Sequence, residues 1–354
     1  MSSREPGDYA IVVGIDAYPR YGANGRHLRG AVRDAKRFYQ WLLNQDTGGG
    51  LDSDNCRLIT SEQNPMALTQ TTVDLALDDL WARARNAGGG RRFYFFFSGH
   101  GQSVVGSDAT TYDQSFCLPQ WSQTMPHAAL NADSYPRVVQ TCMPFREIVM
   151  FLDCCRVPAI KVRAMNSSVG CHAPLEGFEQ VECMAYFAAE PMRRAFEGSV
   201  QTEDDQATDV HGFFSTALME ALQKGSSRPG GGIGAEALWQ YLEYRVPQLA
   251  DENGRRQIPQ RVPLRFSDTV VFGAAGQATA PEAENFEIRF SAARQGPVRL
   301  FDASATEMRA GNPSEASWRV RLEPGETYLL IDEGSGQRRV FVFLADMEGT
   351  HDTF

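Results

Sequence analysis

Long apolar runs are missing from this chain of 354 residues. No stretch approaches the roughly 20 residues that a membrane-spanning helix needs, and residues 1–8 (MSSREPGD) lack the apolar segment of a secretory signal. Positive charge is also scarce, because 34 Lys and Arg stand against 44 Asp and Glu and leave a net charge of −10. Nucleic-acid-binding domains are typically basic. These absences predict a cytoplasmic protein with neither a membrane nor a nucleic acid as partner.

Cysteine patterns of the usual structural kinds are lacking as well. The seven cysteines are odd in number and irregularly spaced, which argues against a disulfide framework, and no C-x-x-C pair supports a structural zinc site. We therefore expect reduced thiols and no bound metal. The chain also has no G-x-G-x-x-G or Walker motif, so nucleotide binding at residues 12–16 (VVGID) has little support.

Two short motifs are present, each at the end of an apolar run. Residues 91–97 (RRFYFFF) lead into SGHG at 98–101, and residues 147–152 (EIVMFL) lead into DCCR at 153–156. Short, continuous runs of aromatic and β-branched residues are typical of strands buried in a parallel sheet. Neighbouring parallel strands end at the same edge of a sheet, so we expect His100 and Cys155 to meet there. A thiol beside an imidazole is a nucleophile with its base, which indicates a cysteine hydrolase.

These motifs resemble the histidine motif and the D-x-C motif of the caspase-like cysteine peptidases. Further stretches resemble the family in the same order, at residues 9–18, 28–35, 212–218 and 257–260. The similarity spans roughly residues 8–270 and is greater to the metacaspase and bacterial branch than to the animal caspases. It implies that Cys155 attacks the scissile carbonyl and that His100 takes the thiol proton. Backbone N–H groups of Gly101 and Cys155 would then hold the oxyanion.

The pattern of apolar residues predicts an α/β fold followed by a small all-β domain. Up to residue 272, strand-like runs alternate with amphipathic helical stretches, which is typical of a mostly parallel sheet with helices on both faces. This agrees with the caspase-like fold that the resemblance implies, and we place the peptidase domain at 8–272. A Gly/Ala/Pro linker at 273–283 precedes short alternating runs over 284–346 that predict a β-sandwich-like domain. Residues 102–143 show no sustained periodicity and are expected to be irregular.

Each candidate residue also has a plainer interpretation. Taken singly, His100 could end a strand and Cys155 could pack as a small core residue, but several motifs in family order favour catalysis. Side chains alternate along a strand, so we assign Cys154 to the core and Cys155 to the site. A catalytically silent caspase-fold scaffold that only binds partners is the alternative, and the presence of both His100 and Cys155 argues against it.

The resemblance also predicts the substrate preference. Animal caspases bind aspartate through an arginine and a glutamine whose positions are taken here by Leu28 and Asp153. Neither can clamp an acidic side chain, whereas Asp153 can pair with a cation, and metacaspase-like members with this Asp cleave after Arg or Lys. Asp113 resembles a further acidic position of the same pocket. We expect cleavage of protein or peptide substrates after Arg or Lys.

The segments after Cys155 contain features that bear on activation. The chain has Arg156 where metacaspases continue H-S-G after the nucleophile. Segment 157–180 contains Lys161 and Arg163 and could be self-cleaved, and the acidic residues 203–205 (EDD) could bind calcium as in some metacaspases. An uncut surface loop and a solvated acidic loop are the interpretations we favour, so no cofactor is expected. The C-terminal domain is predicted to bind a regulatory partner or substrate, or to restrain the active site.

The resemblance to the caspase-like peptidases is also compatible with a bacterial defence or cell-death pathway.

Overall fold

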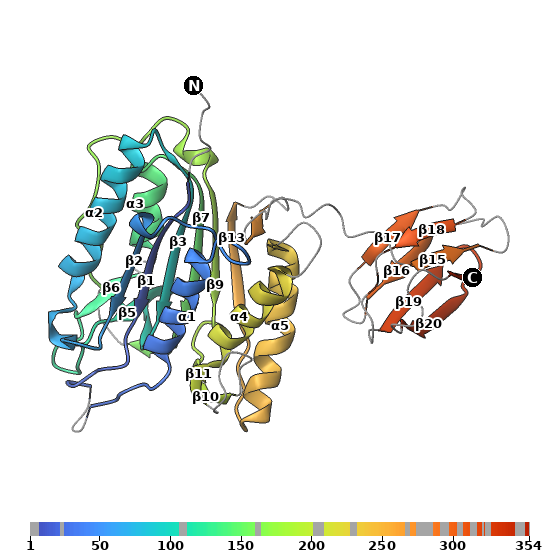
Figure 1. Ribbon diagram of the computed structural model, residues 1–354. Helices are drawn as coiled ribbons and strands as arrows, with labels where there is room; N and C mark the ends of the chain where they lie inside the picture. The colour runs from blue at the N-terminus through green and yellow to red at the C-terminus, as the bar shows by residue number, and fades with distance from the viewer. Residues whose placement is uncertain are drawn as a thin grey trace. The chain divides into compact units, whose positions relative to one another are not determined.

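The computed structural model describes residues 7–21, 25–105, 112–159, 164–200, 209–226, 232–265, 270–273, 286–290, 297–302, 307–311, 317–320, 322, 327–343 and 351–353. The chain divides into two compact units, Met1–Gly276 and Gln277–Phe354 (Figure 1). Each unit is described by itself below.

Six strands form the main sheet of the first unit, in the order β13-β9-β7-β3-β1-β2. They are β1 (Tyr9–Gly14), β2 (Cys56–Thr60), β3 (Gly90–Ser98), β7 (Phe145–Asp153), β9 (Glu182–Phe187) and β13 (Gln260–Arg265). All pairs are parallel except β13 with β9, which is antiparallel. The predicted mostly parallel α/β sheet is confirmed.

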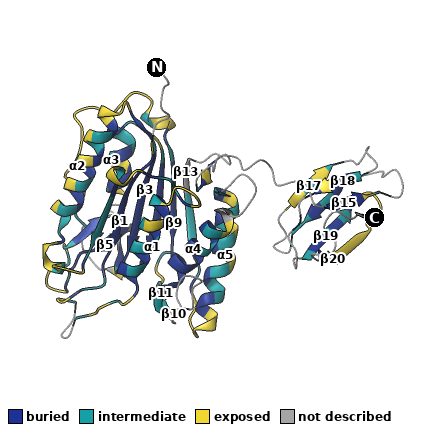
Figure 2. Cartoon of the chain, viewed as in Figure 1, coloured by how far each residue is buried: buried dark blue, intermediate teal, exposed yellow. Residues whose placement is uncertain are grey.

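Helices cover both faces of this sheet (Figure 1). One face packs against α1 (Ala31–Leu43), α4 (Phe213–Ser226) and α5 (Ala235–Glu252), and the other against α2 (Gln70–Asn86) and α3 (Ser134–Cys142). Successive side chains of a strand point to opposite faces, and the run in β3 accordingly divides between two cores. Phe96 packs with Phe38 of α1, whereas Phe95 and Phe97 belong to the core under α2 and α3. Burial on both faces explains why this strand is continuously aromatic from Phe93 to Phe97 (Figure 2).

Segment 102–143, predicted to be irregular, instead contributes to a second sheet of order β6-β5-β4-β8 and to α3. The strands are β4 (Gly101–Val105), β5 (Tyr112–Cys117), β6 (Ala129–Asn131) and β8 (Pro158–Ala159). Polar residues such as Gln102 and Ser115 are buried where β4 pairs with β5. Apolar alternation is therefore weak there, and the prediction of irregular structure was wrong.

The remaining elements of the first unit are short. They are the 3-10 helices η1 (Ser53–Asn55), η2 (Pro65–Ala67) and η3 (Phe178–Gln180), the pair β10 (Glu197–Val200) and β11 (Asp209–Gly212), and the pair β12 (Ile233–Gly234) and β14 (Val271–Phe272).

One disulfide contradicts the expectation of reduced thiols. Cys142 at the end of α3 is bonded to Cys171, with 5.5 Å between the Cα atoms. The two residues are 29 positions apart, and only the folded chain brings the segment after β8 onto α3. The other five cysteines are free.

The second unit contains two small sheets of order β18-β15-β21 and β17-β16-β19-β20. The strands are β15 (Phe286–Arg289), β16 (Val298–Phe301), β17 (Glu307–Gly311), β18 (Ser317–Val320), β19 (Thr327–Asp332), β20 (Arg338–Val342) and β21 (His351–Thr353). All its pairs are antiparallel except β15 with β21. Side chains from both sheets, including Phe286, Leu300, Trp318 and Leu330, form one core. The small C-terminal all-β fold is confirmed.

Candidate active site

The two predicted motifs lie side by side at the carboxyl edge of the main sheet. Ser98 at the end of β3 pairs with Asp153 at the end of β7, so His100 and Cys155 each lie two residues beyond aligned positions. A cleft of about 80 Å³ opens at this edge. It is lined by Leu28, Ala31, Asp34, Ser98, Gly99, His100, Asp153, Cys154, Cys155, Ala195, Phe196, Glu197 and Gly212. The structure thus brings His100 and Cys155 into one cleft.

The His100 ring is held by aromatic side chains and one carbonyl. It packs against Tyr18 and Tyr21, with ring centroids 4.5 and 4.9 Å away, and Nε2 lies 3.0 Å from the Arg26 carbonyl oxygen. A carbonyl only accepts hydrogen bonds, so Nε2 carries the hydrogen and Nδ1 of the neutral ring has a free lone pair. Burial lowers the pKa of His100 to about 4. The ring is therefore a neutral base at pH 7.

Cys155 also rests against a backbone carbonyl. Its thiol donates to the Ala195 oxygen at 3.4 Å. Burial, assisted by the negative charge of Asp153, raises the pKa of Cys155. Within the described part of the chain, no hydrogen bond joins the His100 ring to this thiol. Catalytic hydrogen bonds are often long before substrate binds and tighten in the complex, so this arrangement is compatible with a resting dyad.

Glycine is required on both sides of His100 because the backbone is crowded there. A Cβ at Gly99 would lie 2.5 Å from Tyr18 Oη, and one at Gly101 would lie 2.6 Å from the Cys155 carbonyl oxygen. Real Cβ contacts are not this short. The glycines of the SGHG motif therefore allow the two loops to touch, which keeps His100 in the same cleft as Cys155.

The neighbours of Cys155 in the sequence are buried. Cys154 is 2% exposed and belongs to the core, as the strand alternation predicted. The Arg156 guanidinium lies over the Phe187 ring at 4.2 Å and does not line the cleft.

Asp153 lies buried at the floor of the cleft. Its Oδ2 accepts hydrogen bonds from Ser215 N at 3.0 Å and Ser215 Oγ at 2.7 Å. Burial, reinforced by the nearby Asp34, raises the pKa of Asp153 to about 7. A Cβ at Gly212 would overlap Asp153 Oδ2, which explains the glycine at the start of the family-like stretch 212–218.

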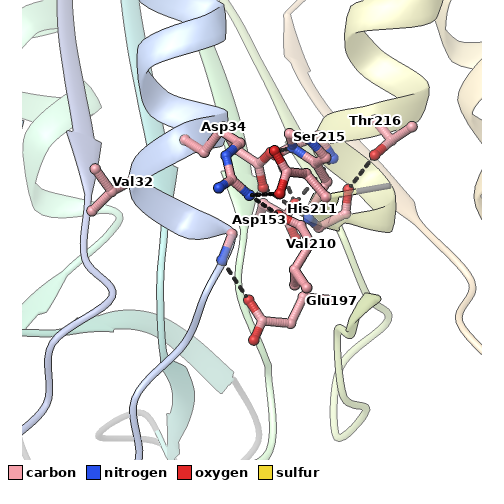
Figure 3. Close-up of polar contacts among 12 residues, drawn as sticks. Val32, Asp34, Asp153, Glu197, Val210, His211, Ser215 and Thr216 are labelled. Atoms are coloured by element: carbon pink, nitrogen blue, oxygen red, sulfur yellow. Dashed lines mark hydrogen bonds and ion pairs between the residues drawn. The ribbon is translucent and has the colours of Figure 1, made fainter. Parts of the chain in front are cut away.

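Two further carboxylates line the cleft and were missed by the sequence reasoning. Asp34 in the first turn of α1 accepts from Gly212 N at 2.8 Å and lies 2.6 Å from His211 Nδ1 (Figure 3). Glu197 accepts from Gly30 N at 2.9 Å and from Arg29 N. The signal for Asp34 was a carboxylate inside the L-x-G-x-x-x-D-A stretch that precedes an apolar helix face. Nothing in the sequence around Glu197 marks it.

The other predicted residues have mixed outcomes. Leu28 lines the cleft. The backbone of Asp113 lies in β5 opposite Val104, but its side chain is outside the described residues, so its predicted pocket role is not tested. Lys161, Arg163 and the acidic residues 203–205 also lie outside the described residues.

Neither a metal cluster nor a membrane span is found in the described part of the chain. No group of three or more His, Cys, Asp or Glu side chains there could hold a metal ion. No described helix has both the length and the apolar character needed to cross a bilayer.

Comparison with known proteins agrees with this geometry. A family model described as the caspase domain matches residues 8–269. The chain belongs to the caspase-domain family. It therefore carries a cysteine peptidase domain, and the predicted resemblance is confirmed.

Two individual proteins are also similar to this chain. One is named a probable protease from a Desulfuromonadales bacterium and is 27% identical over 300 residues, which cover 76% of this chain and 33% of the relative. The chain thus spans about a third of the length of that curated relative. The other is the crystal structure of protein GSU0716 from Geobacter sulfurreducens, with 17% identity and a TM-score of 0.48, covering 75% of this chain and 96% of that one.

Proposed function

We propose that this protein is a cysteine endopeptidase that uses His100 and Cys155 to cut protein substrates after Arg or Lys. The observation that carries the proposal is a single cleft that holds the thiol and the imidazole together with the carboxylates of Asp34, Asp153 and Glu197. The thiol and the imidazole support peptide hydrolysis, and the three carboxylates support recognition of a cation.

The reaction follows from the protonation states at rest. When a peptide carbonyl reaches Cys155, the thiol proton passes to His100 Nδ1 as sulfur forms its bond to the carbonyl carbon. Backbone N–H groups of Gly101 and Cys155 stabilise the negative oxygen. His100 then gives the proton to the leaving amine, and the peptide C–N bond breaks. Water, deprotonated by the same imidazole, hydrolyses the thioester and restores the thiol.

The charge of the cleft favours a basic substrate residue. Among the described residues, no lysine or arginine lines it, whereas three carboxylates do. The structure records no hydrogen bond from the described residues to Asp153 Oδ1, so this oxygen is available to a guanidinium or ammonium group. An aspartate side chain would instead meet like charge. Leu28 adds an apolar surface for the stem of a long basic side chain.

Release of a fluorogenic leaving group from peptides ending in Arg, Lys, Asp or Ala tests this proposal, with and without calcium. We expect cleavage after Arg and Lys only, loss of activity in Cys155→Ala, and a KM roughly 10- to 100-fold higher in Asp153→Asn. Cleavage after Asp would keep the peptidase and overturn the pocket assignment. Dependence on calcium would contradict the expectation that no cofactor is needed.

A silent scaffold is the second candidate, favoured by the absence of a hydrogen bond between the His100 ring and the thiol among the described residues. A peptidyl-arginine chloromethyl ketone distinguishes the two, because it alkylates a cysteine that an engaged pocket aligns. Labelling of Cys155 would exclude the scaffold. The metacaspase-like type, a cytoplasmic location, a defence or cell-death pathway and a regulatory partner of the C-terminal unit stay predictions.

A further inference from the structure

A fully buried histidine contacts Asp34, one of the carboxylates that line the cleft. His211 in β11 has 0% of its surface exposed, and its Nδ1 lies 2.6 Å from Asp34 Oδ1 (Figure 3). The two residues are 177 positions apart and come from different elements. His211 itself does not line the cleft, whereas Asp34 does.

The short contact determines where the hydrogen lies. An ionised carboxylate only accepts hydrogen bonds, so Nδ1 of His211 must donate to Asp34, whatever the state of Nε2. The second oxygen of Asp34 accepts from Gly212 N at 2.8 Å. Both oxygens of Asp34 are therefore engaged by donors of the protein, and its carboxylate has one fixed orientation.

Asp34 and Asp153 differ in how many of their carboxylate oxygens accept hydrogen bonds. Asp153 receives both of its recorded hydrogen bonds, from Ser215 N and Oγ, on Oδ2. A Cβ on Gly212 would approach oxygens of both carboxylates, so they flank the same small residue. Only Asp153 has an oxygen that no hydrogen bond of the described residues engages.

We propose that His211 is a positioning residue for substrate recognition: its Nδ1–H holds Asp34 as a fixed carboxylate in the same cleft as Asp153, which pairs directly with the basic side chain of the substrate. The inference rests on the proposed function. Asp34 then contributes negative charge without moving, and Asp153 supplies the contact.

Charged groups of both signs surround Asp34 and His211. They are Arg33 and Arg37 of α1, Asp16 after β1, Asp153 of β7 and Glu197 of β10. Burial raises the pKa of Asp34, and the His211 hydrogen bond and the charge of Arg37 oppose that rise. Without the His211 donor, Asp34 takes up a proton at a higher pH, and the pocket loses negative charge.

The test compares His211→Leu, which removes the donor, with His211→Asn, whose side-chain N–H can occupy the place of Nδ1. For peptides ending in Arg, we expect His211→Leu to raise KM about tenfold or more and to leave kcat within about threefold. The acidic limb of its kcat/KM profile should move to higher pH. His211→Asn should restore most of the wild-type KM and profile.

Labelling of Cys155 gives a second readout. Peptidyl-arginine chloromethyl ketone should react more slowly with His211→Leu than with wild type, while iodoacetamide, which needs no pocket, reacts equally. If His211→Leu does not fold, Asp34→Asn in the wild-type background should show the same rise in KM.

Three outcomes would overturn the inference. Unchanged KM and pH profile in folded His211→Leu and in Asp34→Asn would remove the roles of His211 and Asp34 but leave the pairing of Asp153 with the substrate in place. If His211→Asn folds but has the same KM and pH profile as His211→Leu, the Nδ1–H hydrogen bond is not what positions Asp34. Absence of basic cleavage by wild type would remove the inference together with the proposed function.

Discussion

At the scale of single residues, the two side chains of the proposed dyad contact separate backbone carbonyl groups. His100 contacts the Arg26 carbonyl and Cys155 the Ala195 carbonyl. Burial lowers the pKa of the imidazole to about 4 and raises that of the thiol, so an ion pair is disfavoured before substrate arrives. In the proposed reaction, the thiol proton must therefore move to His100 while Cys155 attacks the carbonyl carbon.

This resting state predicts how Cys155 reacts without substrate. His100→Ala should abolish peptide cleavage but change the rate of iodoacetamide labelling of Cys155 only a few-fold, because the imidazole does not activate the free thiol. Labelling of both proteins should still increase above pH 8. Mass spectrometry of the modified peptide measures both rates, and a large loss of labelling in His100→Ala would show that the pair is already coupled.

Asp153 predicts a dependence of stability on pH. Its pKa of about 7 in the folded protein lies above the ordinary value of 3.8. The folded state holds the proton that the unfolded chain has released, so this stabilisation is lost as pH rises through about 7. Asp153→Asn should therefore have a higher Tm than wild type at pH 8. The difference in Tm between the two proteins should be smaller at pH 5.

Differential scanning fluorimetry at both pH values checks this expectation. Asp46→Asn, at an exposed position, is the matched control and should show no such difference between the two pH values. A lower Tm of Asp153→Asn at pH 8 would contradict it.

At the scale of elements, the segment between β8 and β9 is fastened by contacts from outside itself. Asp74 of α2 accepts hydrogen bonds from Ser167 Oγ at 2.9 Å and from Ser168 N at 2.9 Å. The Cys142–Cys171 disulfide ties the same segment to α3. These tethers fix residues 167–171 of this segment against α2 and α3.

Removing the disulfide should loosen this segment. Closing a loop of 29 residues lowers the conformational entropy of the unfolded chain. This loss adds at most about 3–4 kcal/mol to the free energy of unfolding. Wild type should therefore lose thermal stability in a reductant, whereas Cys171→Ser should already melt lower and not respond to it. Cys155→Ser, which keeps the disulfide, should respond like wild type. An equal response of Cys171→Ser and wild type would contradict the prediction.

At the scale of the whole molecule, the chain consists of two units with separate cores. The two apolar clusters of the first unit and the cluster of the second share no residue. The caspase-domain match at 8–269 lies within the first unit, Met1–Gly276. Every described residue of the cleft belongs to that unit.

A fragment of residues 1–276 should therefore fold alone. We expect cooperative thermal unfolding by circular dichroism and labelling of Cys155 at the rate of the full chain, because its core and cleft are complete. Residues 277–354 expressed alone should give a β-type spectrum. A fragment 1–276 that aggregates or unfolds without cooperativity would show that the first unit needs the second.

Much of the sheet and the central site could be predicted because the signals are local. The apolar runs of β3 and β7 mark strands buried on both faces, and parallel strands must end at one edge. Because β3 and β7 are neighbours in the folded sheet, this geometry brings His100 and Cys155 to the same edge. The same reasoning could not recognise β4 and β5, whose buried polar residues lack apolar alternation and pair only through the folded chain.

The sequence by itself therefore determined the α/β sheet, the two strand-end motifs and the β-rich second unit. Only the tertiary structure decided which carboxylates share the cleft, which histidine holds Asp34 and which cysteines are bonded. The physical reason is range: strand and helix patterns repeat over a few neighbouring residues, whereas Asp34 and His211 meet across 177 positions. Such meetings depend on how whole elements pack, and no local pattern records them.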